Sequence, residues 1–259
     1  LVVLCLPDDA AKESVALADA LGQDSPRIID ASTAHRVASG WVYGFPEMTR
    51  GHEAAVKAAT RVSNPGCYPT GAVALIRPLV EAGLMPADHP VTVNAVSGYS
   101  GGGKAMIETY DNGTAPSFEL YGLGMTHKHV AELQKFSLLN KRPIFVPSVG
   151  NFRQGMLVSV PLHLSTLKGS PKIAALQEVL AAHYRGSALV SVIDQNDAST
   201  KGGRIEPEAL NNTDRLELRI FGSDDAGHAV LVARLDNLGK GASGAAVQCM
   251  GLMLGIKTV

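Results

Sequence analysis

Residues 1–30, LVVLCLPDDAAKESVALADALGQDSPRIID, hold the pattern that decides the fold class. Leu1–Leu6 is continuously apolar, which is typical of a strand buried on both faces of a parallel sheet. Asp8 or Asp9 can cap the helix that follows, and residues 27–30 form a second short strand. Two strands joined by a helix predict a right-handed crossover between parallel neighbours. The sequence therefore predicts an α/β protein.

The rest of the chain changes character after about residue 140. Helices are expected after the turn at Pro69 and from a Thr126 cap, with a strand over Val91–Ser97 between them. Further along, strands dominate, and one helix capped by Ser170 interrupts them. The expected strands are 143–149, 155–164, 188–193, 215–221 and 228–235, and the helix is 171–184. Several strands follow one another without a helix, so we expect a mixed or antiparallel sheet here. A helix rich in glycine and alanine closes the chain after Lys240.

Composition and charge exclude several classes of protein. The chain has 259 residues, 46% of them hydrophobic and 18% charged, with 27 glycines, which is typical of an α/β protein of one or two domains. Its formal net charge is -1 and no block of like charges occurs, so no nucleic-acid partner is expected. The apolar segment Gly241–Ile256 is too short to span a bilayer, so no membrane partner is expected. Three widely separated cysteines favour a reducing, cytoplasmic location.

Cys67 is the strongest candidate for chemistry. It lies in the turn Ser63-Asn-Pro-Gly-Cys-Tyr-Pro-Thr70, directly before a helix whose first turn carries no acidic residue. Unpaired amides and the positive end of the helix dipole favour a thiolate there, so we expect a Cys67 pKa below about 8.5. Cys5 and Cys249 lie inside apolar segments, where cysteine usually serves as a small buried hydrophobic residue. Cys67 is therefore the predicted nucleophile.

His127 and His129 flank Lys128 at the expected start of the next helix. A histidine at a helix N-terminus is biased toward its neutral form and can accept a proton at neutral pH. Side chains two apart on a helix point to different sides, so at most one of the pair is expected to face Cys67. Glu132 is close enough in sequence to orient His129. A purely structural pair is one alternative. A metal site is another, but the remaining histidines show no ligand spacing, so no metal is predicted.

Three further segments suit ligand binding by their residue types. The glycine-rich loop ending in Lys104 can cradle an anion, although a flexible surface turn has the same composition. Arg153, in a turn between two expected strands, can clamp a substrate carboxylate or be a solvated surface arginine. Ser32 follows the second strand, where ligands bind in open α/β sheets, and the junction Asp236–Gly244 allows close approach of backbone to a cofactor.

The order of these motifs resembles the N-acetyl-gamma-glutamyl-phosphate reductase family, in its second, shorter type. The resemblance covers the whole chain and rests on Leu4–Asp9, Asn64–Gly71, Val96–Lys104, Tyr121-Gly122, Thr126–His129, Gly150–Phe152, Asp236–Ala242 and Gln248. It implies that the Cys67 thiolate attacks N-acetyl-L-glutamyl 5-phosphate to form a thioester, which NADPH reduces to N-acetyl-L-glutamate 5-semialdehyde in arginine biosynthesis. His129, or less favourably His127, moves the proton, and backbone amides after Cys67 stabilise the oxyanion.

The resemblance also implies binding residues. Those implied for the substrate are Ser97, Gly98, Lys104, Glu132 and Arg153. Those implied for the cofactor NADPH/NADP are Pro7, Ser32, Gly98 and Asn237. Many relatives carry an arginine one position after Arg153, where this chain has Gln154.

The implied fold is that of glyceraldehyde-3-phosphate and aspartate-semialdehyde dehydrogenases. A Rossmann-like NADP-binding domain is expected over residues 1–66 and 236–259, and an α/β catalytic and oligomerisation domain with a mixed or antiparallel sheet over 67–235. The family opens with a strand, a glycine-rich phosphate loop and a helix, and this βα unit is absent before Leu1. We therefore expect weak or absent NADPH binding by residues 1–259 alone. A homo-oligomer, either dimer or tetramer, is also expected.

Two related enzymes and one non-enzymatic role are the alternatives. Aspartate-semialdehyde dehydrogenase shares the chemistry, but its nucleophile motif is usually Asn-Cys-Thr, unlike Gly66-Cys-Tyr-Pro-Thr70. A carrier-linked aminoadipyl-phosphate reductase of lysine synthesis shares the motifs. A non-catalytic scaffold would keep the fold without the chemistry, and the intact Cys67, His127 and His129 argue against it.

Overall fold

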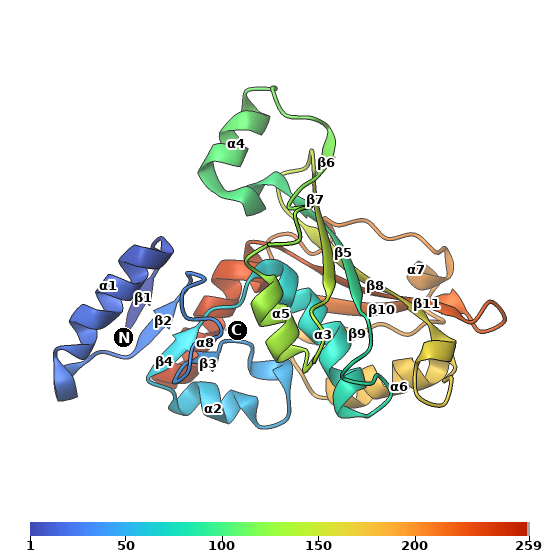
Figure 1. Ribbon diagram of the computed structural model, residues 1–259, viewed down its shortest axis with the longest axis horizontal. Coiled ribbons are helices and arrows are strands. Elements are labelled where there is room, and N and C mark those ends of the chain that lie inside the picture. The colour runs from blue at the N-terminus through green and yellow to red at the C-terminus, as the bar shows by residue number, and fades with distance from the viewer. Residues whose placement is uncertain (258–259) are drawn as a thin grey trace.

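Two β-sheets organise the chain in the computed structural model, which describes residues 1–257 (Figure 1). A four-stranded sheet has the order β1-β2-β4-β3, and a seven-stranded sheet has the order β6-β7-β5-β8-β11-β10-β9. The predicted α/β class is confirmed. Within the described range, no helix is both long enough and apolar enough to cross a membrane.

The first sheet is parallel throughout and is built from the start of the chain. Its elements are β1 (Val2–Leu4), α1 (Asp8–Asp19), β2 (Ile28–Asp30), β3 (Val42–Tyr43), α2 (His52–Ala58) and β4 (Arg61–Ser63). The last helix of the chain, α8 (Gly244–Leu254), packs against this sheet. The buried residues of this contact are Ile29, Val56, Val62, Cys249 and Met253. Both ends of the chain therefore share one core.

The predicted crossover from β1 through α1 to a parallel β2 is confirmed, but two details of it are wrong. β1 has a single neighbour and lies at the edge of the sheet, so Val2 and Val3 are each 40% exposed rather than buried. The helix cap also differs. Pro7 occupies the N-cap of α1, and the Asp8 carboxylate instead accepts a hydrogen bond from the Thr33 amide at 2.9 Å.

The second sheet is mixed, as the sequence predicted. β5 (Thr92–Gly98) runs parallel to β7 (Ile144–Gly150) on one side and antiparallel to β8 (Met156–His163) on the other. The remaining strands are β6 (Phe118–Leu120), β9 (Val190–Val192), β10 (Leu216–Ser223) and β11 (His228–Leu235). All the strands expected after residue 140 are present, with small shifts at their ends.

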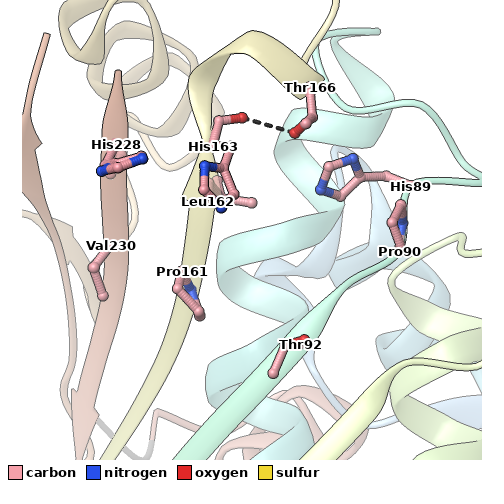
Figure 2. Close-up of a pocket in the computed structure, with 10 residues that line it drawn as sticks. His89, Pro90, Thr92, Pro161, Leu162, His163, Thr166, His228 and Val230 are labelled. Carbon is pink, nitrogen blue, oxygen red and sulfur yellow. Dashed lines mark hydrogen bonds between the residues drawn. The ribbon is translucent and has the colours of Figure 1, made fainter. Parts of the chain in front are cut away.

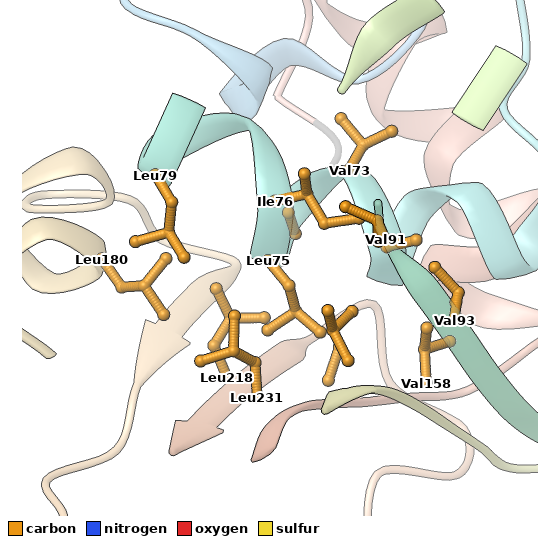
Figure 3. Packing of buried hydrophobic residues seen from close by; sticks show 14 of the residues in the cluster. Val73, Leu75, Ile76, Leu79, Val91, Val93, Val158, Leu180, Leu218 and Leu231 are labelled. Carbon is orange, nitrogen blue, oxygen red and sulfur yellow. The ribbon is translucent and has the colours of Figure 1, made fainter. Parts of the chain in front are cut away.

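α3 (Cys67–Glu81) and α6 (Ile173–His183) pack on this second sheet, and Figure 3 shows the apolar side chains at the contact. The packed residues include Leu75, Ile76, Leu79, Leu180, Leu218 and Leu231. Each fully buried side chain of this size contributes about 1.5–3 kcal/mol relative to an exposed one. This packing holds α3 in place, and with it the residue at its first position, Cys67.

Two further predicted helix caps are wrong. Thr126 does not begin a helix, because residues before His129 form turns. His129 is the N-cap of α5 (Val130–Phe136). Ser170 does not cap α6 either. The amide of Ile173, the first residue of α6, donates instead to the carboxylate of Asp224 at 2.9 Å. Asp224 lies in the turn between β10 and β11.

The glycine-rich segments are more helical than expected. The loop predicted around Lys104 is the start of α4 (Gly103–Asp111), which buries none of its residues and projects from the rest of the fold (Figure 1). A short helix, α7 (Ala198–Lys201), was not predicted. The closing helix was predicted, but a π-helical turn, Gly239–Ser243, precedes it.

Candidate active site

A cavity of about 800 Å³ lies where the two sheets meet, at the carboxyl ends of the parallel strands of the first sheet. Both ends of the chain and the start of α3 contribute to its wall. The lining residues with polar or reactive side chains include Arg36, Asn64, Cys67, Tyr68, Tyr121, His127, His129 and Asn237. The structure thus brings the predicted nucleophile and both predicted histidines to one place.

The backbone of Cys67 is held on two sides. Gly66, the N-cap of α3, has a carbonyl that accepts the amide and the hydroxyl of Thr70, each at 3.0 Å. On the other side, a side chain at Gly241 would place its Cβ 2.9 Å from the Cβ of Cys67. Only glycine allows this approach, so the nucleophile is packed directly against the segment before α8.

The expected low pKa of Cys67 is wrong. Burial raises the pKa of the Cys67 thiol to about 11, a hydrogen bond from the Tyr68 amide and the charge of Arg36 oppose the rise, and Glu132 adds to it. Desolvation disfavours the thiolate more strongly than one helix N-terminus favours it. At neutral pH the resting Cys67 is therefore a thiol, and its reaction needs a proton acceptor within the cavity.

His127 and His129 both line the cavity that holds Cys67. The two residues precede α5 rather than lie within it, so the spacing rule for helical side chains does not apply. Their ring centroids are 4.7 Å apart, and His127 Nδ1 accepts the amide of His129 at 3.2 Å.

His129 lies next to the nucleophile turn, because a Cβ at Gly66 would be 2.8 Å from its Nε2. The ring is buried, and its Nδ1 has no hydrogen-bond partner among the described residues. Burial holds the pKa of His129 well below its usual value, and the charges of Arg36 and His127 add to this. Burial, rather than a helix dipole, thus favours the neutral imidazole that the sequence predicted. A neutral ring at this position can accept a proton.

The expectation that Glu132 orients the His129 ring is wrong, because its carboxylate is bonded elsewhere. Oε1 accepts Arg36 Nη1 at 2.8 Å, and Oε2 accepts the Tyr43 hydroxyl at 2.8 Å and the Gly66 amide at 3.0 Å. Burial raises the pKa of Glu132, and Arg36 opposes the rise. Glu132 therefore fixes the residue before the nucleophile, and it does not line the cavity.

Arg36 is a site residue that the sequence reasoning missed. Its guanidinium pairs with Glu132 and also donates to the carbonyls of Asn64 at 2.9 Å and Ala31 at 3.1 Å. It thereby ties the ends of β2 and β4 to α5. Its place in the polar loop after a parallel strand was the one signal that pointed to it.

The other residues predicted for the substrate do not reach the cavity wall. The side chain of Lys104, on α4, is 90% exposed, and its Nζ lies 3.8 Å from Glu108 Oε1. Arg153 is exposed as well. Ser97 is buried and donates its hydroxyl to the Gly98 carbonyl at 2.9 Å. Gly98 packs so closely on the backbone of Arg153 that a Cβ there would lie 2.6 Å from it.

Of the residues predicted for the cofactor, Asn237 lines the cavity. Its Oδ1 accepts a backbone amide at 2.8 Å and its Nδ2 donates to Ser100 Oγ at 3.0 Å, which leaves one amide hydrogen for a ligand. Pro7 caps α1, and Ser32 donates to the Asp30 carboxylate at 2.7 Å. Neither Pro7 nor Ser32 lines the cavity.

A second cavity, of about 410 Å³, lies on the second sheet (Figure 2). Figure 2 shows His163 and His228 on neighbouring strands and His89 across from them. The ring centroids of His163 and His228 are 4.7 Å apart. None of the predicted functional residues lines this cavity. In the part of the chain that the structure describes, no group of three or more His, Cys, Asp or Glu residues is arranged to hold a metal ion.

Comparison with known proteins assigns the chain to a family. The semialdehyde dehydrogenase dimerisation domain matches residues 67–237. The chain is 55% identical, over 260 residues, to the N-acetyl-gamma-glutamyl-phosphate reductase of Brucella suis and 54% identical to that of Brucella ovis. Each alignment covers 98% of this chain and 83% of the relative. The chain belongs to the N-acetyl-gamma-glutamyl-phosphate reductase family.

Two solved structures of aspartate semialdehyde dehydrogenases have a fold similar to that of this member of the reductase family. Aspartate semialdehyde dehydrogenase II from Vibrio cholerae is similar with a TM-score of 0.71 at 16% identity, covering 98% of this chain and 79% of that chain. The enzyme from Francisella tularensis is similar with a TM-score of 0.71 at 15% identity, covering 97% of this chain and 80% of that chain. The likeness confirms the predicted fold class. Membership of the reductase family makes the chain an oxidoreductase.

Proposed function

We propose that this protein catalyses the NADPH-dependent reductive dephosphorylation of N-acetyl-L-glutamyl 5-phosphate to N-acetyl-L-glutamate 5-semialdehyde, a step of arginine biosynthesis. One observation carries the proposal. Cys67, at the first position of α3, and the neutral His129 line the same cavity, in a chain 55% identical to a reductase of that name. A thiol with a proton acceptor in the same cavity is what covalent capture of an acyl phosphate requires.

The acylation step uses residues of this chain alone. Cys67 Sγ attacks the acyl carbon, a carbon–sulfur bond forms, and the bond from that carbon to the phosphate oxygen breaks. The thiol proton passes to the neutral His129 in the same step as the attack, because a thiol of pKa about 11 does not transfer its proton in advance to an imidazole whose pKa lies well below its usual value. Phosphate leaves, and a thioester remains on Cys67.

The negative charge that develops on the acyl oxygen needs hydrogen-bond donors. The Gly66 amide is bonded to Glu132 at 3.0 Å and is not available. Within the first turn of α3 the Thr70 amide donates to the Gly66 carbonyl at 3.0 Å. Pro69 has no N–H and the Tyr68 amide bonds the thiol, so we assign the amide of Cys67 itself as the donor. No acidic side chain lies in this first turn to repel the charge.

The cavity suits a nicotinamide group next to Cys67. Part of its wall is apolar, with Val3, Ala246, Val247 and Met250 among the lining residues. Asn64 Oδ1 is buried without a partner among the described residues and is free to accept a hydrogen bond from the ligand. Gly241 has no side chain, so the space beside Cys67 stays open on that side. When bound, reduced nicotinamide supplies the hydride that the thioester carbon accepts. The preference for NADP over NAD stays a prediction from the family resemblance.

The last step releases the aldehyde. After hydride addition the tetrahedral oxyanion collapses to the semialdehyde, the carbon–sulfur bond breaks, and Cys67 leaves as a thiolate. His129 then returns the proton that it took in the first step, and the resting thiol is restored. His127 is the weaker candidate for this proton transfer, because it is His129 whose Nε2 lies against Gly66, the residue before the nucleophile.

We further propose the division of the chain into domains that the resemblance implies. Residues 1–66 and 236–259 form the NADP-binding domain, and residues 67–235 form the catalytic and oligomerisation domain of a cytoplasmic homo-oligomer. The burial of α8 residues in the core of the first sheet and the dimerisation-domain match over residues 67–237 support this division. Light scattering of the purified protein across a dilution series measures the oligomer.

The remaining binding roles stay predictions. They concern Ser97, Gly98, Lys104, Glu132 and Arg153 for the substrate, and Pro7, Ser32, Gly98 and Asn237 for the cofactor.

The reverse reaction tests the proposal. The purified full-length protein is incubated with N-acetylglutamate semialdehyde, phosphate and NADP, and formation of NADPH is followed by absorbance. We expect phosphate-dependent NADPH formation, slower turnover of aspartate semialdehyde, and none with Cys67→Ala. Activity that survives Cys67→Ala would refute the thioester mechanism. Equal rates on both aldehydes would refute the substrate assignment.

A further inference from the structure

Lys240 is fully buried, yet the reaction steps above make no use of it. Its Nζ donates to both carboxylate oxygens of Glu47, each at 2.9 Å, and to Gln248 Oε1 at 2.6 Å. Gln248 Nε2 in turn donates to Glu47 Oε1 at 2.8 Å. We call these three residues the lysine cluster. All three hydrogens of the ammonium group have an acceptor, so the geometry of the cluster is fully specified.

The ammonium group of Lys240 fixes the position of its own backbone segment and does not bind a ligand in the cavity. The residue does not line the cavity, and its ammonium group lies 5.3 Å from the centroid of the Phe45 ring. An ammonium group removed from water stays charged in a fold only when it is paired and hydrogen-bonded. The backbone that carries Lys240 is therefore held at a fixed distance from Glu47.

That backbone is the π-helical turn Gly239–Ser243, which touches the nucleophile turn at two points. Gly241 packs against Cys67 so closely that a Cβ would lie 2.9 Å from the Cys67 Cβ. The carbonyl of Ala242 accepts Asn64 Nδ2 at 2.9 Å. π-Helical turns are uncommon and often lie at functional sites. This one forms part of the cavity wall beside the thiol.

We propose that Lys240 is a positioning residue for Cys67. Through Glu47 and Gln248 it holds the π-helical turn against the nucleophile turn, and the thiol consequently keeps the orientation from which it attacks. The role rests on the proposed function of Cys67. Displacement of a nucleophile by about 1 Å costs up to about 100-fold in rate, so loss of the cluster should slow acylation without weakening substrate binding to the same extent.

Acylation of the thiol by p-nitrophenyl acetate tests this role. The reaction needs neither cofactor nor natural substrate. It is run in a Cys5→Ser background, because Cys5 is exposed, and the burst of p-nitrophenolate then reports Cys67, with Cys67→Ser as the blank. We compare Lys240→Met, which keeps the length of the side chain and removes its charge, with Lys12→Met, a matched change at a lysine whose side chain is 58% exposed. We expect Lys240→Met to lower the burst rate constant by about tenfold or more, and Lys12→Met to leave it unchanged.

Two further measurements separate positioning from general stability. In the natural reaction Lys240→Met should lower kcat more than it changes KM. Gly241→Ala leaves the lysine cluster intact but forces the π-helical turn away from Cys67, so it should slow the burst in the same way. This variant replaces Lys240→Met as the test if Lys240→Met does not fold. A folded Lys240→Met with the wild-type burst rate constant overturns the role, as does wild-type acylation by Gly241→Ala. A wild-type protein that gives the burst but does not turn over N-acetylglutamate semialdehyde refutes the proposed function alone.

Discussion

Arg36 and Glu132 form a buried ion pair directly behind the turn that carries Cys67, with Arg36 Nη1 2.8 Å from Glu132 Oε1. Their side chains are 10% and 1% exposed. Because Glu132 also accepts the Gly66 amide and the Tyr43 hydroxyl, the pair links β3, α5 and the nucleophile turn. The position of the reactive thiol thus depends on a contact between segments far apart in the sequence.

Arg36→Met should destabilise the protein by about 3–5 kcal/mol, because it leaves the buried Glu132 carboxylate without its charge partner. Urea denaturation at neutral pH measures the change in the free energy of unfolding. Arg50→Met, at an exposed arginine, is the control and should change that free energy by less than about 0.5 kcal/mol. Equal destabilisation by the two variants would contradict the assigned role of the ion pair.

His129→Gln should lower kcat by about 100-fold to 10,000-fold, the usual contribution of a general acid–base. The physical reason is that a thiol with a pKa of about 11 must pass its proton to a neighbour as it reacts at neutral pH. His127→Gln should cause a smaller loss. Steady-state kinetics of both variants give the comparison, and a larger loss for His127→Gln would assign the proton transfer to that residue instead.

Alkylation of Cys67 by iodoacetamide should keep accelerating with pH well above the range of an ordinary cysteine. The thiolate fraction rises about tenfold per pH unit until the pKa is reached, and burial places that pKa at about 11. The rate is measured in a Cys5→Ser background, because Cys5 is exposed. A plateau below about pH 8.5 would show that the helix N-terminus outweighs burial, as the sequence alone suggested.

The same pKa makes the stability of the protein depend on pH at the alkaline end. Burial raises the pKa of Cys67 from 9.0 to about 11, so the folded state holds the thiol proton more tightly than the unfolded chain does. The resulting contribution is complete below pH 9.0 and is lost as the pH rises toward 11. Between those values the free energy of unfolding should fall more steeply for the wild type than for Cys67→Ala. Parallel pH profiles of the two proteins would contradict this.

Leu75→Ala should destabilise the protein by about 2–5 kcal/mol, because Leu75 lies at 0% exposure where α3 meets the second sheet. Leu17→Ala, at a leucine that is 68% exposed, is the matched control and should have little effect. Urea denaturation compares the two. If both variants unfold at the same urea concentration, α3 is not anchored by this core.

Local pattern was enough to predict much of the fold. The strands after residue 140 show apolar runs of strand length between turn residues, and each formed close to its expected bounds. The stretch around Trp41 carried no such pattern. β3 (Val42–Tyr43) has two residues and α2 (His52–Ala58) has seven, so neither is long enough for a period to be visible. They form because β4 and α8 supply the surfaces against which they pack.

The sequence by itself determined the α/β class and the family, and it singled out Cys67 and the pair of histidines as the candidates for catalysis, because turn residues and motif order are properties of neighbouring positions. Only the tertiary structure decided the charge state of Cys67 and the partners of Glu132 and Lys240. It also brought both histidines to one cavity. Desolvation and ion pairing depend on which side chains lie within a few ångströms, and here the paired side chains are 96 and 193 residues apart in the sequence.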